Sequence, residues 1–82
     1  MEPSEIARLI EANFDNANVT VTSDDNTHFE ALVVAAEFEG VRPLARHQLV
    51  YNSLGALVGN EIHALSIHAF TPAEFRQQDR ED

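Results

Sequence analysis

The sequence contains no cysteine, no lysine and no tryptophan among its 82 residues. The lack of cysteine excludes disulfide bonds, a thiol nucleophile and an all-Cys metal site formed by this chain alone. Its five basic residues, all arginine, face fourteen acidic residues, and the resulting net charge of −9 disfavours nonspecific binding to nucleic-acid phosphates. No apolar run approaches the roughly 20 residues of a membrane span. The first residues also lack the basic and apolar regions of a secretory signal, so we expect a cytoplasmic protein with no membrane association.

A chain of this length predicts one domain with one modest core. The hydrophobic fraction of 44% and charged fraction of 23% are typical of globular domains. We assign residues 1–78 to a single domain and residues 79–82 to a solvated acidic tail.

Hydrophobic periodicity predicts six elements in the order α-β-β-α-β-α. They are a helix from Pro3 towards Phe14, strands over 19–22 and 29–38, a helix from Pro43 to about Leu57 closed by Gly59-Asn60, a strand over 62–70, and a short helix after Thr71. Thr71 and Glu74 are spaced as a capping box around Pro72.

The short connection between the first two strands predicts an antiparallel pair, and the helix before the third strand predicts a parallel crossover. We therefore expect a two-layer α+β fold, a three-stranded mixed sheet with its helices on one face. The core is expected to contain Phe38, Val50, Leu54, Leu65 and Ile67.

No motif in the sequence indicates an enzyme. There is no nucleophile held by a base and an orienting group, and the three glycines stand apart instead of forming a phosphate-binding loop. Most carboxylates fall where a solvated surface or loop would place them. We expect no catalytic site.

The four histidines are the remaining candidates for metal ligands. Alternation along a strand would put His63 on the core side and His68 on the opposite face. His63 is then either a core-edge residue bonded to a backbone carbonyl or a ligand. His47 lies on the apolar stripe of the central helix, so packing is its simplest interpretation. His28 precedes the second strand, at an exposed place where a ligand could bind.

One region of positive charge interrupts the acidic sequence. Arg42, Arg46 and His47 fall within one and a half helical turns, and residues 40–60 include no acid. These side chains either contact an anionic partner or phosphate, or are simply solvated or paired with a nearby acid such as Glu37 or Glu39.

Several spaced motifs resemble the BolA family. The family signature F-x-G-x5-R-H-x2-V-Y is present as Phe38, Gly40, Arg46, His47, Val50 and Tyr51. The H-F pair is His28 and Phe29, and the I-H-A-L sequence is Ile62 to Leu65. The T-P-x-E-aromatic ending is Thr71, Pro72, Glu74 and Phe75, and the motifs follow one another in the same order as in the family. The short length and the loop from Ser23 to Phe29 resemble the IbaG (YrbA-like) branch.

The resemblance implies a class II KH-like fold and a partnership with a cytosolic monothiol glutaredoxin. The two proteins would share a bridging [2Fe-2S] cluster in iron–sulfur trafficking or in iron or stress regulation. The family's cluster ligand on the C-terminal strand corresponds to His63. The family's second ligand, a Cys or His between the first two strands, is missing from residues 23–27, which leaves His28 as the nearest substitute. Thiolates of the partner and of glutathione would complete the coordination, so the isolated chain would hold no cluster.

The resemblance also implies an alternative function, a DNA-binding transcriptional regulator of the stress response. That function is attributed partly to the region of Arg46 and His47. The segment Gly40-Val41-Arg42-Pro43 is not the G-x-x-G clamp of nucleic-acid-binding KH domains. Nucleic acid is therefore a possible partner that the net charge disfavours.

Overall fold

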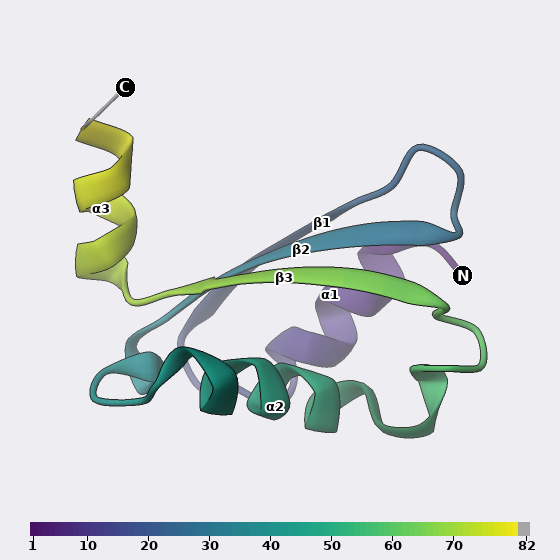
Figure 1. Cartoon of the computed structure of the whole chain (residues 1–82), viewed down its shortest axis with the longest axis horizontal. Helices are drawn as coiled ribbons and strands as arrows, with labels where there is room; N and C mark the ends of the chain where they lie inside the picture. The colour runs from purple at the N-terminus through teal and green to yellow at the C-terminus, as the bar shows by residue number, and fades with distance from the viewer. Residues whose placement is uncertain (81–82) are drawn as a thin grey trace.

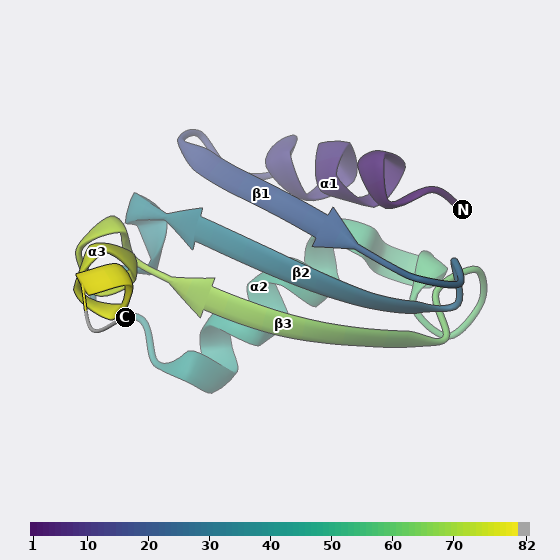
Figure 2. The same ribbon diagram turned by 90° about the horizontal axis from the view of Figure 1, so that it is seen from above.

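The three strands form one mixed sheet in the order β1-β2-β3 (Figure 2). The computed structural model describes residues 1–80, with side chains up to residue 78. Strands β1 (Ala17–Thr22) and β2 (His28–Ala35) are antiparallel, and β2 pairs in parallel with β3 (Ala64–Phe70). The expected order and directions of the strands are therefore confirmed.

Helices α1 (Pro3–Glu11) and α2 (Pro43–Leu54) cover one face of the sheet (Figure 1). Helix α3 (Pro72–Arg80) departs from this expectation, because it stands at the end of the sheet where β3 finishes, away from the other two helices. Each helix has a proline in its first turn, where the missing N–H has no helical acceptor to lose.

The core lies between the sheet and helices α1 and α2. Four of the five predicted core residues are buried, and Leu65 is partly buried against them. The buried apolar residues are Ile6, Ile10, Phe29, Ala31, Val33, Ala35, Phe38, Val50, Leu54, Ile62 and Ile67. The alternation of exposed and buried residues along β2 leaves the other face of the sheet open.

Strand β2 is shorter than the sequence predicted. It ends at Ala35, opposite Ala17 where β1 begins, and residues Ala36–Phe38 form a 3₁₀ turn. This turn directs Phe38 into the core, where its ring lies 5.5 Å from that of Phe14 in an edge-to-face pair. The aromatic contact explains why the apolar run continues beyond the strand.

Helix α2 and strand β3 also have different ends from those predicted. Gly55, with a φ angle of 57°, ends α2 and starts a second 3₁₀ turn, so the helix does not reach Gly59. The backbone groups of Ile62 then bond to Leu57 and Gly59. Because these groups are already paired, β3 begins at Ala64 and not at Ile62.

The solvated tail predicted at residues 79–82 lies mostly outside the described residues. Residues 81–82 lie outside the described residues, as do the side chains of 79 and 80, whose backbone continues α3. Across the described part of the chain, no helix has the length and apolar character needed to cross a bilayer.

Candidate functional site

His28 and His63 lie at the same end of the sheet, which we call the histidine corner. His28 is the first residue of β2 and is the register partner of Ala64, which directly follows His63. The β1–β2 loop and the segment leading into β3 meet at this end in both views (Figures 1 and 2). Both histidines are exposed, so an approaching molecule can reach their rings.

His63 differs from its sequence-based description. It occupies a bend before β3, so strand alternation does not determine its direction, and it is exposed rather than on the core side. The buried Ile62 holds the chain on one side and the β3 ladder holds it on the other. Because the His63 side chain is exposed, the interpretation of His63 as a core-edge residue is wrong.

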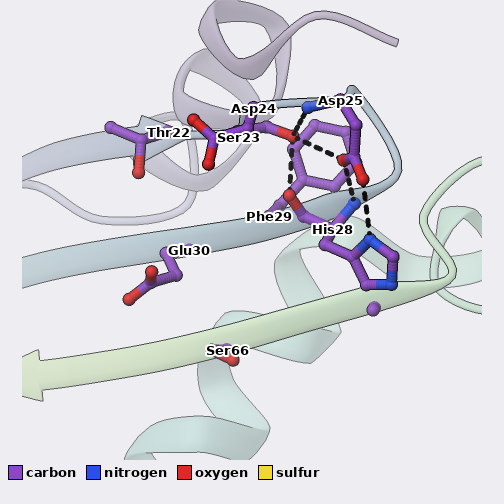
Figure 3. A pocket seen from close by; sticks show the side chains of 9 residues that line it. Thr22, Ser23, Asp24, Asp25, His28, Phe29, Glu30 and Ser66 are labelled. Carbon is purple, nitrogen blue, oxygen red and sulfur yellow. Dashed lines mark hydrogen bonds and ion pairs between the residues drawn. The ribbon is translucent and has the colours of Figure 1, made fainter.

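Asp25 holds the His28 ring in place (Figure 3). Its Oδ2 atom lies 3.0 Å from His28 Nδ1, while Oδ1 accepts the backbone N–H groups of Thr27 and His28, both at 2.9 Å. These bonds, led by that from the His28 N–H, hold the pKa of the Asp25 carboxyl well below its ordinary range. The loop therefore presents His28 in a defined orientation.

A pocket of about 310 Å³ adjoins His28 on the open side of the sheet. Its polar lining residues are Thr22, Ser23, Asp24, Asp25, His28, Glu30 and Ser66. Within residues 1–80, no group of three or more His, Asp or Glu side chains is arranged to hold a metal ion. A metal group at the histidine corner would therefore need ligands from another molecule.

His68 belongs to a different part of the sheet. It lies on the outer face of β3, opposite Leu32, and its Nε2 atom is 3.2 Å from Glu30 Oε1. It lies four positions after Ala64, or about 13 Å along a strand. His68 therefore cannot join His28 around one small cluster.

Arg46 is largely buried, contrary to its expected place in a positive surface region. Its side chain is 10% exposed and forms a forked ion pair with Glu74, at 2.6 and 3.3 Å. It also donates to the carbonyls of Val41 and Ala69, at 2.7 and 3.2 Å. The alternative that Arg46 pairs with Glu37 or Glu39 is wrong, because α3 brings Glu74 to the buried end of this side chain.

Glu74 also completes the predicted capping box. It accepts the Thr71 N–H at 2.8 Å, and the Thr71 hydroxyl accepts the Glu74 N–H at 3.2 Å. The bonds from Arg46, reinforced by the Thr71 N–H, lower the pKa of the Glu74 carboxyl from 4.5 to about 2. One carboxylate thus fixes the start of α3 and joins it to α2.

The low pKa of Glu74 predicts a dependence of stability on pH. Because the folded pKa is below the unfolded value, the ionised carboxylate stabilises the fold above pH 4.5, and this contribution is lost as the pH falls towards 2. Glu74→Gln should lower the urea midpoint at neutral pH, and its difference from wild type should shrink through this window. Glu39→Gln, at an exposed turn, is the control. A Glu74→Gln difference that stays constant with pH would contradict this assignment.

Arg42 and His47 remain closer to the surface. Arg42 is exposed at the start of α2, and His47 is half-buried. His47 and Arg46 line a second, shallow groove of about 580 Å³ between α2, the end of β3 and α3. Of the three expected contact residues, Arg42 is thus the only exposed one, while Arg46 and His47 line this groove.

The order of elements and the histidine corner define a small α+β domain whose counterparts are BolA proteins. A family model described as BolA-like protein matches residues 7–74. The solved structure of a BolA homologue from Coxiella burnetii has a TM-score of 0.82 and 39% identity, covering 93% of this chain and 97% of that one. The chain belongs to the BolA family.

Curated relatives support the same assignment. Human BolA-like protein 1 is 38% identical over 74 residues, which cover 90% of this chain and 54% of the relative. The Vibrio cholerae protein named DNA-binding transcriptional regulator BolA is 43% identical over 61 residues, which cover 74% of this chain and 58% of the relative. The chain thus spans about half the length of these relatives, whose names describe no enzyme. The IbaG branch stays a prediction.

The sequence analysis missed two contacts, that of Asp25 with His28 and that of Glu74 with Arg46. Asp25 precedes His28 by three residues, a spacing that allows an Asp side chain to bond within a turn, and could have been found. The Arg46–Glu74 contact joins residues 28 apart, and no local pattern indicates it.

Proposed function

We propose that this chain is the partner of a cytosolic monothiol glutaredoxin and shares a bridging [2Fe-2S] cluster with it. In this proposal His63 is one ligand and His28 is the second. One observation carries it: two exposed imidazoles lie at one corner of a cysteine-free chain whose described residues form no complete metal site.

The donor set suits a shared group better than a resident one. Iron–sulfur clusters are held mainly by thiolates, and replacing thiolates by histidine raises the reduction potential. The thiolates would come from the glutaredoxin Cys and from glutathione, while this chain supplies imidazole nitrogen. Its own contribution is to hold accessible rings on a rigid sheet end. Such a pair of proteins would act in iron–sulfur trafficking or in iron or stress regulation.

Titration of cluster-loaded monothiol glutaredoxin with this chain tests the proposal. Visible circular dichroism should change and saturate at a fixed ratio, because histidine replaces another ligand on iron. Cluster-free glutaredoxin is the control for docking alone. A visible spectrum that does not respond to the added chain would contradict the proposed function.

DNA binding is the second candidate, because the relative from Vibrio cholerae is named a DNA-binding regulator. The net charge of −9 opposes it, and Arg46 already pairs with Glu74. A mobility shift that weakens steeply with salt, and weakens further in Arg42→Ala, would support this candidate. We expect no shift by the isolated chain at physiological salt.

A further inference from the structure

The contacts of Asp25 restrict how His28 can act as a ligand. One carboxylate oxygen is engaged by two backbone N–H groups, and this fixes the other oxygen towards His28 Nδ1. An ionised carboxylate accepts hydrogen bonds and donates none. At this distance, Nδ1 must therefore carry the ring proton of a neutral His28.

We propose that Asp25 is a positioning residue that fixes His28 as the Nδ1–H tautomer and leaves Nε2 as its iron-binding atom. The proposal rests on the proposed function, because it specifies how the second histidine of the shared site is prepared. The bond made by one ring nitrogen commonly decides which nitrogen of a histidine binds metal.

The position of the ring agrees with this role. Figure 3 shows Nδ1 facing Asp25 and the other ring nitrogen turned away from the loop. The His28 side chain is 74% exposed, so Nε2 is open to a second protein. Ser23 reinforces the loop, since its hydroxyl donates to the His28 carbonyl at 2.6 Å and accepts the Asn26 N–H at 2.9 Å.

The tautomer can be measured on the isolated chain by long-range ¹H–¹⁵N NMR of the histidine rings. Above about pH 8, where histidine is neutral, wild-type His28 should show a protonated Nδ1 and an unprotonated Nε2. This measurement requires neither a cluster nor a variant. A predominantly protonated Nε2 in the wild-type protein would overturn the proposal.

Asp25→Asn should reverse the tautomer. The Asn oxygen can keep the two backbone N–H bonds, which places its NH₂ group against Nδ1 and makes that nitrogen an acceptor. Nε2 then carries the proton. Asp24→Asn is the matched control, because it removes the same charge from an exposed neighbour that makes no hydrogen bond to His28 within the described structure. Unchanged amide shifts of Thr27 and His28 would show that the loop is intact.

The cluster provides a separate readout. Asp25→Asn should weaken retention of the shared cluster against a chelator by roughly tenfold, the lower end of the range for loss of a ligand's supporting bond. Asp24→Asn should not, and Asp25→Asn should add nothing in a His28→Ala background. If both Asn variants lost cluster retention equally, the effect of Asp25 would come from its charge alone, and the positioning role would be overturned.

The two proposals fail in different ways. Absence of any shared cluster with the wild-type chain overturns the proposed function and the ligand role of His28 together. The NMR experiment still decides whether Asp25 sets the ring. A shared cluster that forms with wild type but is unaffected by His28→Ala overturns the ligand role of His28 alone.

Discussion

Arg46→Ala should lower the free energy of unfolding by about 2–4 kcal/mol. The change removes both donors to the Val41 and Ala69 carbonyls and leaves Glu74 without its guanidinium. It also removes packing, because the guanidinium carbon lies 5.7 Å from the centre of the buried Phe38 ring. Chemical denaturation followed by far-UV circular dichroism measures the loss.

Two matched variants separate charge from geometry. Arg42→Ala removes the same side chain from an exposed position four residues away, and should change stability by less than about 0.5 kcal/mol. Arg46→Lys keeps the charge but lacks the planar fork, so it should fall between wild type and Arg46→Ala. If Arg46→Ala were as stable as Arg42→Ala, the ion pair with Glu74 would have no structural role.

His63→Ala should change the visible circular dichroism of the mixed complex with glutaredoxin far more than His68→Ala does. His63 adjoins His28 at the histidine corner, whereas His68 lies about 13 Å along β3 and already pairs with Glu30. Loss of a nitrogen ligand alters the electronic spectrum of the cluster. His28→Ala should give an effect between these two if His28 is the weaker ligand.

The comparison of these histidine variants needs two controls. Thermal melts should show that each variant is folded, which we expect because both His63 and His68 are exposed. Binding of the cluster-free partners should survive each change, since docking involves a wider surface. An unaltered cluster spectrum in folded His63→Ala would exclude His63 as a ligand.

Much of the fold follows from local chemistry in the sequence. Prolines in the first turns indicate where the helices begin, and the alternation of apolar and polar residues indicates β1. The capping box of Thr71 and Glu74 indicates the last helix. These features were predictable because each depends on residues within one or two turns of one another.

The ends of elements and the long-range pairs were not predictable in this way. His63 falls outside β3 because the turn after α2 uses the backbone of Ile62, which depends on where Gly55 ends the helix. Arg46 was expected at the surface because α3 alone brings Glu74 to it. In both cases the position of the side chain depends on contacts between segments distant in the sequence, which a local sequence pattern does not indicate.

The hydrogen bonds along the outer side of β3 also bear on aggregation. β3 ends the sheet, and an edge strand offers unpaired backbone groups to strands of other chains. Here the Ala69 carbonyl accepts Arg46, and the Leu65 carbonyl accepts the Tyr51 hydroxyl at a longer 3.4 Å. Two side chains of α2 thus occupy alternate acceptors that an incoming strand would need. The helix that encloses the core therefore also hinders the pairing of another chain with the β3 edge of the sheet.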